Sequence, residues 1–184
     1  MKREAAPVKI KFTYEDYLHF SEDKRYEIID GEVYMVPAPV PYHQRILGNL
    51  YLRLREFVEK EGIGEVYLAP CDVVLSDIDV VQPDIMFISN ERLNIITEKN
   101  IRGAPDLIIE IISPSSEYRD KVIKRKLYSK YGVKEYWLVD PEKREVELMT
   151  LRESVLTEEK IYKGKNVIES SVLRGLKIEL NKIF

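Results

Sequence analysis

Cysteine and histidine are nearly absent from this chain. The 184 residues contain one cysteine, Cys71, and two histidines, His19 and His43. A single cysteine cannot form a disulfide within the chain, and scarce cysteine is typical of proteins kept in a reducing compartment. The sequence also offers no cluster of cysteine and histidine that would hold a structural zinc ion.

Long apolar runs are absent as well. No stretch approaches the roughly 18 apolar residues that a membrane-spanning helix needs. The N-terminal residues 1–7 carry charge with no apolar segment behind them, so no signal peptide is expected. These absences predict a cytoplasmic protein without a membrane partner.

An excess of positive charge is also missing, because the net charge is −3. Proteins that coat nucleic acid are usually basic overall, so any phosphate-binding surface must be local. The 45% of apolar and 33% of charged residues are typical of a folded globular protein. The length favours one domain, residues 1–184, with a full hydrophobic core.

The most informative segment is 83–140, where Pro-Asp begins two apolar runs, residues 83–88 and 105–112. Glu110 lies inside the second run. A carboxylate buried among β-branched residues is costly unless it is paired, hydrogen-bonded or bound to a metal. Two such strands ending near one another would bring Asp84 and Glu110 together, and paired carboxylates on adjacent strands are a common way to hold a divalent cation.

Hydrophobic periodicity and turn residues predict an α/β fold. The expected core, about 42–151, has the order helix, three strands, helix, strand, which favours a central mixed sheet with helices on both faces. A helix and hairpin at about 12–36, turning at Asp30-Gly31, precede it, and a β extension at about 152–184 follows it. The predicted elements are a helix at 13–20 capped by Thr13, a hairpin at 25–36, a helix at 42–60, strands at 66–75 and 80–89 joined by a turn at 76–79, a loop at 90–103, a strand at 107–112, a helix from Ser115 or Ser116 to 131, a hairpin of 135–140 with 146–151, and strands at 158–162 and 167–171.

Several of these segments resemble one family. The chain is similar to the Uma2-type proteins, also called DUF820, of the PD-(D/E)XK restriction-endonuclease-like superfamily, from about Tyr26 to Phe184. The matching pieces are residues 26–32, His43 at the start of the long helix, Pro83-Asp84, residues 105–115, Asp120, Lys124, Tyr128 and residues 132–140.

The resemblance implies a nuclease-like core with a Mg²⁺ (or Mn²⁺) site. Asp84 and Glu110 would take the roles of the two metal carboxylates, and the backbone carbonyl of Ile111 would be the third ligand. Magnesium acidifies a water and neutralises developing charge on a phosphate, which is what hydrolysis of a phosphodiester in DNA requires.

One position departs from the family pattern. The superfamily places a lysine two residues after the glutamate, and Ile112 stands there. Lys124 on the following helix is the expected substitute, giving the catalytic set Asp84, Glu110 and Lys124. Asp120, Lys124 and Tyr128 are spaced four residues apart, so they share one helical stripe.

Other residues are candidates of second rank. Glu27 is a further metal or supporting carboxylate, His43 a contact for phosphate or water, and Asp120 a capping or ion-pairing residue. A basic cluster on the same helix would contact DNA phosphates without reading sequence. Its members are Arg119, Lys121, Lys124, Arg125, Lys126 and Lys130.

Three functions remain open from the sequence. The first is a divalent-metal-dependent endonuclease acting on DNA. The second is an inactive nuclease fold that binds nucleic acid or a protein. The third is an interaction module whose hairpin extensions build a homodimer, with Tyr34, Tyr42 and Tyr67 as interface candidates. The position of the Lys124 ammonium discriminates them, because catalysis needs it within about one water of the two carboxylates.

Overall fold

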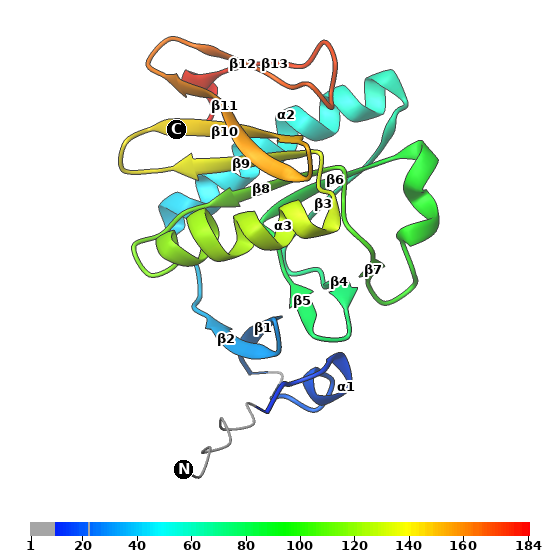
Figure 1. Ribbon diagram of the computed structural model, residues 1–184. Coiled ribbons are helices and arrows are strands. Elements are labelled where there is room, and N and C mark those ends of the chain that lie inside the picture. Colours follow the sequence, from blue (N-terminus) through cyan, green and yellow to red (C-terminus); the bar gives the residue numbers. More distant parts are fainter. Residues whose placement is uncertain (1–9, 22) are drawn as a thin grey trace, which may run out of the picture.

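The computed structural model describes residues 10–21 and 23–184 (Figure 1). Its central sheet has six strands in the order β11-β10-β9-β8-β6-β3. Only β8 and β9 run parallel, and the other neighbours are antiparallel, so the predicted mixed sheet is confirmed. The strands are β3 (Gly64–Leu68), β6 (Ile85–Ser89), β8 (Leu107–Ile111), β9 (Glu135–Asp140), β10 (Glu145–Arg152) and β11 (Val155–Lys163).

Helices cover both faces of this sheet, as predicted (Figure 1). Helix α2 (Pro41–Glu61) has its apolar residues at helical spacing, and its Leu50 and Leu54 pack with Ile109 of β8. The residues on either side of Ile109 face the opposite side of the sheet, because side chains alternate along a strand. Ile108 packs with the residues of α3 (Arg125–Tyr131), and Glu110 therefore points toward α3 from the middle of the molecule.

A second, five-stranded sheet was not expected from the sequence. Its order is β2-β1-β5-β4-β7, and it lies below the central sheet in Figure 1. The predicted hairpin forms one edge, with Asp30 and Gly31 both at positive φ in its turn. The strands are β1 (Arg25–Ile29), β2 (Glu32–Val36), β4 (Val73–Ser76), β5 (Asp79–Val81) and β7 (Ile101–Arg102).

The two long strands predicted at 66–75 and 80–89 are wrong as continuous elements. Each is divided between the sheets: β3 and β6 belong to the central sheet, and β4 and β5 to the second. Pro70 interrupts the first run and Pro83 the second, because proline has no N–H to give to a ladder. Asp84 consequently lies where the chain passes from one sheet to the other.

The helix predicted from Ser115 or Ser116 begins at Ser116, whose carbonyl accepts from the Asp120 amide. The Ser116 hydroxyl does not cap it, since it accepts from the Ser113 amide. A π-helical turn, Arg119–Lys124, precedes α3, and it was not predicted. Gly132 ends the helix in the left-handed conformation, as expected.

The terminal elements agree with the sequence in outline. Thr13 and Asp16 form a capping box on α1, but the helix covers only Tyr14–Tyr17. The predicted loop at 90–103 contains a 3₁₀ turn, Asn90–Ile95, as well as β7. At the C-terminus β12 (Val167–Glu169) pairs with β13 (Lys177–Glu179), and the 3₁₀ turn Leu180–Lys182 follows. No helix in the described part of the chain is long and apolar enough to cross a bilayer.

Asp79 connects the second sheet to α3. Its buried carboxylate accepts from the Asp30 amide at 2.7 Å, from the Tyr131 hydroxyl at 2.6 Å and from the Lys130 ammonium at 3.1 Å. Burial alone would raise the pKa of Asp79, but these donors outweigh it and hold the pKa below its ordinary value. The connection fixes the strand that carries Glu27 against the helix that carries Lys124.

We expect Asp79→Ala to lower the free energy of unfolding by at least about 1.5–3 kcal/mol, the contribution of a hydrogen bond to a charged group. Asp77→Ala is the matched control, because the Asp77 side chain is exposed in the same turn. Urea denaturation of both variants measures the difference. Equal stability of the two would show that the Asp79 contacts do not hold the sheets together.

Candidate active site

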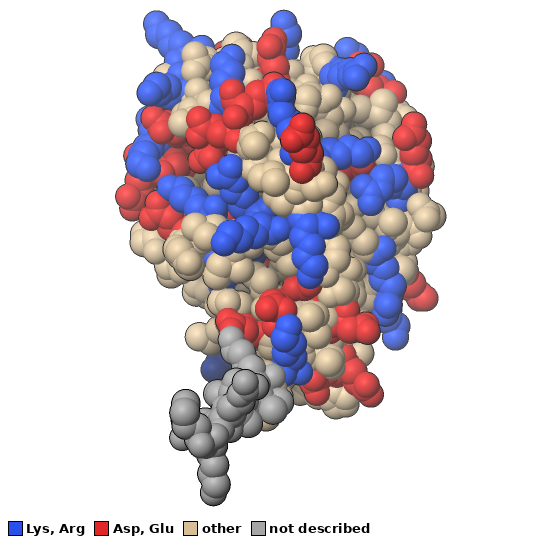
Figure 2. Space-filling view, in the orientation of Figure 1, with Lys and Arg blue, Asp and Glu red and all other residues tan. Residues whose placement is uncertain are grey.

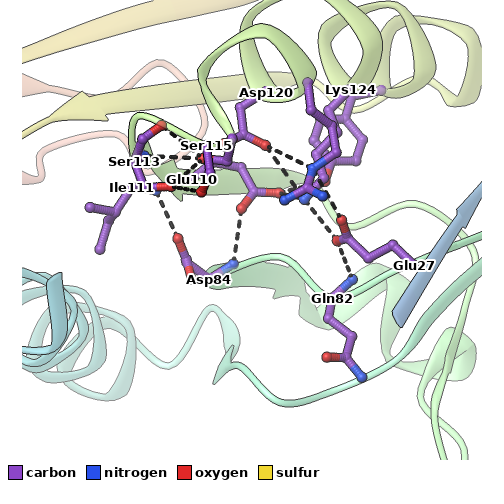
Figure 3. Close-up of polar contacts among 12 residues, drawn as sticks. Glu27, Gln82, Asp84, Glu110, Ile111, Ser113, Ser115, Asp120 and Lys124 are labelled. Carbon is purple, nitrogen blue, oxygen red and sulfur yellow. Dashed lines mark hydrogen bonds and ion pairs between the residues drawn. The ribbon is translucent and has the colours of Figure 1, made fainter. Parts of the chain in front are cut away.

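Asp84 and Glu110 lie side by side at the junction of the two sheets (Figure 3). Asp84 Oδ2 accepts from the Ile111 amide at 2.8 Å, and the Asp84 amide lies 3.4 Å from Glu110 Oε2. The imidazole of His43, near the start of α2, is 3.2 Å from Asp84 Oδ2. The strand interruption at Pro83 places Asp84 just before β6, and the antiparallel pairing of β6 with β8 then brings Asp84 next to Glu110.

Lys124 reaches this pair from the helix. Its ammonium is 2.8 Å from Glu110 Oε1, 2.7 Å from Glu27 Oε1 and 3.7 Å from Asp120 Oδ1. The side chain is only 3% exposed, so Lys124 does not belong to the solvated face of the helix. Ile112 cannot place a cation beside Glu110, and the ammonium of Lys124 lies there instead.

The π-helical turn explains how Asp120, Lys124 and Tyr128 all face the sheet. In a regular α-helix, residues four apart overshoot one full turn, and the stripe drifts around the axis. A π-turn holds more residues per turn, so the step from Asp120 to Lys124 falls short of a full turn. The α-helical step from Lys124 to Tyr128 overshoots a full turn and so cancels this angular shortfall, which leaves all three side chains on the face toward the sheet. There the Tyr128 hydroxyl donates to Glu110 Oε1 at 2.7 Å.

Glu27 comes from the second sheet and is 1% exposed. Its Oε1 accepts from the Gln82 amide at 2.9 Å as well as from Lys124. Its Oε2 has no hydrogen-bond partner among the described residues and lies 3.7 Å from Arg119 Nε. The hairpin at 25–36 therefore supplies part of the candidate active site.

Two participants were not proposed as site residues from the sequence. Gln82 holds Glu27 through its backbone amide, and Tyr128 holds Glu110 through its hydroxyl. Tyr128 had a visible signal, since it continues the spacing of Asp120 and Lys124. Gln82 had none, because a backbone donor can come from any residue type.

Negative charge is in excess at the site. Four carboxylates, those of Glu27, Asp84, Glu110 and Asp120, surround two permanent cations, Lys124 and Arg119. Burial raises the pKa of Glu110 to about 8, Lys124 opposes the rise, and the neighbouring carboxylates add to it. Burial alone would lower the pKa of Lys124, but the attraction of the carboxylates outweighs it and raises that pKa, so the ammonium stays charged.

The raised pKa of Glu110 predicts a pH-dependent stability in metal-free buffer. Glu110 binds its proton more tightly in the folded protein, with a pKa of about 8, than at the ordinary value of 4.5. Its contribution to stability is therefore complete below about pH 4.5 and is lost as the pH rises through 8. Urea denaturation at several pH values in EDTA should show this loss in the wild type and not in Glu110→Gln. The same pH slope in both proteins would contradict the assignment.

The site opens into a cleft of about 690 Å³. Segment 36–42 forms one wall, and the turns at 113–117 and 140–143 form the other. Asp84 and His43, with 17% and 13% of their side chains exposed, are more accessible than Glu110 and Lys124, with 5% and 3%. A substrate would therefore meet Asp84 before it meets Glu110.

The basic residues predicted to contact phosphates divide into two groups. Arg119 and Lys124 point into the cleft. Lys126 is exposed, Lys121 pairs with Glu117 at 2.6 Å, and the guanidinium of Arg125 donates to the carbonyl of Leu156 at 2.9 Å. Lys130, which binds Asp79, also keeps 58% of its side chain exposed. Figure 2 shows a band of basic side chains across the molecule at the level of α3.

The residues present fit a divalent cation. No three Asp, Glu, His or Cys side chains in the described part of the chain gather closely enough to hold a metal by themselves. Asp84, Glu110 and a backbone carbonyl would instead make a partial set of hard oxygen ligands, as Mg²⁺ prefers. The Ile111 carbonyl faces the same side of β8 as the amide that binds Asp84. The excess of carboxylates favours added positive charge, as do Glu27 Oε2 and Asp120 Oδ1, which accept no hydrogen bond from the described residues.

The mixed sheet, with Pro-Asp before β6, Glu110 on β8 and Lys124 from the following helix, has the arrangement expected of a restriction-endonuclease-like fold. The chain belongs to the Uma2 family: the family model, described as "Putative restriction endonuclease", matches residues 13–181. The resemblance and the fold class predicted from the sequence are therefore confirmed. The comparison with curated proteins finds no match.

A solved structure has the same fold. It is a protein from Anabaena variabilis ATCC 29413 described as "a putative nuclease belonging to DUF820". The TM-score is 0.79 with 20% sequence identity, and the match covers 94% of this chain and 97% of that one. The two chains therefore share the fold over nearly their whole length.

Proposed function

We propose that this protein is a divalent-metal-dependent endonuclease that hydrolyses phosphodiester bonds in DNA. One observation carries the proposal: Asp84 and Glu110 lie together in the lining of a cleft, with the Lys124 ammonium 2.8 Å from Glu110. The Uma2 family and the nuclease fold support the reaction class. One fold hosts many activities, and the side chains of the site decide which chemistry is possible.

The metal, Mg²⁺ or Mn²⁺, would be held by Asp84, Glu110 and the carbonyl of Ile111. When bound, it supplies a Lewis acid that acidifies a water and neutralises charge on the phosphate. The chain holds these ligands in place beforehand, because the Ile111 amide and His43 orient Asp84, while Tyr128 and Lys124 orient Glu110. Such fixed orientation of ligands is what supporting hydrogen bonds provide at metal sites.

Lys124 would donate a hydrogen bond to the attacking water or to a phosphate oxygen. Glu27 and Asp120 keep its ammonium charged and aimed at Glu110. A fixed cation stabilises developing negative charge more effectively than a mobile one, because it needs no reorganisation during the reaction. Lys121, Arg125 and Lys126, on the more exposed part of the helix, would contact phosphates farther from the reaction.

The alternative is a nuclease fold that binds nucleic acid or a protein without cleaving. A specific observation favours it: Lys124 is surrounded by three carboxylates and is almost entirely buried. An ammonium held that firmly has to release one partner before it can contact a substrate. Displacement of Glu110 toward a bound cation would release it, so metal dependence separates the two functions.

Cleavage by the purified protein tests the proposal. The substrates are supercoiled plasmid, single-stranded DNA and RNA, each incubated with Mg²⁺, Mn²⁺ or EDTA. We expect cleavage that requires the metal. No cleavage of any substrate with either metal would contradict the proposal and support the binding-only alternative.

We further propose that the protein acts as a cytoplasmic homodimer. The hairpins expected to build the interface carry exposed apolar side chains, with Met35 of β2 57% exposed and Val155 of β11 53% exposed. Light scattering coupled to size-exclusion chromatography measures the mass in solution, and a mass of one chain at micromolar concentration would contradict the dimer.

A further inference from the structure

We infer that the cleft accepts a single unpaired strand of nucleic acid and excludes an intact duplex. The inference rests on the proposed function and names the substrate class of the same site. Three features of the cleft support it: the depth of the reacting groups, the apolar character of one wall, and the charge of the lining.

The candidate catalytic groups lie deep. The side chains of Glu27, Glu110 and Lys124 are each 5% exposed or less. A duplex holds its phosphates on the outside of a rigid, wide rod, whereas a single strand can bend into a pocket. The volume of about 690 Å³ falls in the range of sites that enclose one small ligand, so a nucleotide with its phosphate would fit.

One wall of the cleft is apolar and rigid. Segment 36–42 reads Val-Pro-Ala-Pro-Val-Pro-Tyr and carries no charged side chain. Val40 is 63% exposed and Tyr42 is 37% exposed, although both are hydrophobic. Such a surface suits the flat face of an unpaired base, because stacking on an aromatic ring favours every base type. Pro37 and Pro39 restrict the backbone of this wall and reduce the entropy lost on binding.

The cleft repels a dense row of phosphates. Its lining holds seven carboxylates, at positions 27, 84, 110, 117, 120, 140 and 142, against four cationic side chains, at 25, 119, 124 and 143. Duplex DNA carries one charge for about every 1.7 Å of its axis, counting both strands, so it would suffer the greater repulsion. A single strand carries only one phosphate backbone, and its unpaired bases can stack against the apolar wall.

Arg119 is placed to bind the phosphate of that one backbone. Its guanidinium lies over the ring of Tyr34 at 5.9 Å from the centroid. Its buried Nε has no hydrogen-bond partner among the described residues, and the nearest carboxylate oxygen, Glu27 Oε2, is 3.7 Å away. Nε also lies 4.0 Å from Asp120 Oδ1, so no carboxylate in the described part of the chain is within hydrogen-bond distance of it. A planar guanidinium matches a phosphate better than an ammonium does.

Fluorescence anisotropy tests the inference. The probes are a labelled 12-nucleotide single strand and the blunt duplex of the same sequence, titrated with the wild-type protein in Ca²⁺ at low temperature. We expect the single strand to bind at least tenfold more tightly. Tyr42→Ala should weaken its binding about 5- to 150-fold, the range for loss of one stacked base. Leu52→Ala, an exposed apolar residue of the same helix outside the cleft lining, is the matched control.

Duplex binding as tight as single-strand binding would overturn the inference, as would unchanged single-strand binding by Tyr42→Ala. The failures of the two proposals are distinguishable. Single-strand preference without cleavage under any metal leaves the inference standing and removes the hydrolase. Cleavage confined to fully paired DNA keeps the hydrolase and overturns the inference.

Discussion

Lys124→Met is expected to lower the free energy of unfolding by about 3–5 kcal/mol in metal-free buffer, the cost of removing one partner from a buried ion pair. The ammonium is the nearest cation to both Glu27 Oε1 and Glu110 Oε1. Without it, several carboxylates share one buried region with Arg119 as the remaining cation, and burial of unpaired charge is strongly unfavourable. Urea denaturation in EDTA measures the loss.

The control for this variant is Lys121→Met, three residues earlier on the same helix. Lys121 pairs with Glu117 at the surface, where 31% and 52% of the two side chains are exposed. Its removal should change stability by no more than about 1 kcal/mol. If Lys124→Met is as stable as Lys121→Met, then Lys124 is not the counter-ion of the buried carboxylates. Added Mg²⁺ should recover more stability in Lys124→Met than in the wild type.

Asp84→Asn and Glu110→Gln are expected to lower metal-dependent cleavage by more than about 100-fold. Partners that only orient a metal ligand typically cost 10- to 100-fold when they are changed, and a ligand should cost more. Both substitutions keep the shape of the side chain and reduce the excess of negative charge. The folded state should therefore persist, with a melting temperature equal to or above that of the wild type.

Asp140→Asn is the matched control for these activity measurements. Asp140 also lines the cleft, but its carboxylate accepts from the amides of Glu142 and Lys143 in its own turn. Its cleavage rate should stay within a few-fold of the wild type. Equal activity of Asp84→Asn, Glu110→Gln and the wild type would place the reaction elsewhere in the molecule.

Local signals in the sequence were sufficient to predict most of the central sheet and its two helices. The apolar run at 107–112, the helical spacing at 42–60 and the turn at Asp30-Gly31 each have one favourable structure, so they could be predicted. The division of residues 66–75 and 80–89 between two sheets could not. Both halves of each run contain apolar residues that favour strands, and only long-range pairing decides which sheet each half joins.

Part of the candidate active site could also be predicted from local sequence signals. Asp84 and Glu110 stand out because a carboxylate at or within a buried strand needs a partner. The closeness of Glu27 to Lys124 depends on how the second sheet packs against the helix, and the buried Asp79 that aligns them gave no sequence signal. The π-helical turn also depends on packing, since nothing in residues 119–124 distinguishes it from an α-helix.

Titration of Mn²⁺ into the purified protein tests the central claim most directly, because it requires no knowledge of the substrate. Isothermal titration calorimetry of the wild type should show one ion bound per chain at the Asp84–Glu110 site. Asp84→Asn should bind it at least about tenfold more weakly, and Asp140→Asn should bind it as the wild type does. Equal Mn²⁺ binding by the wild type and Asp84→Asn, or no binding by either, would contradict a metal site at these two carboxylates.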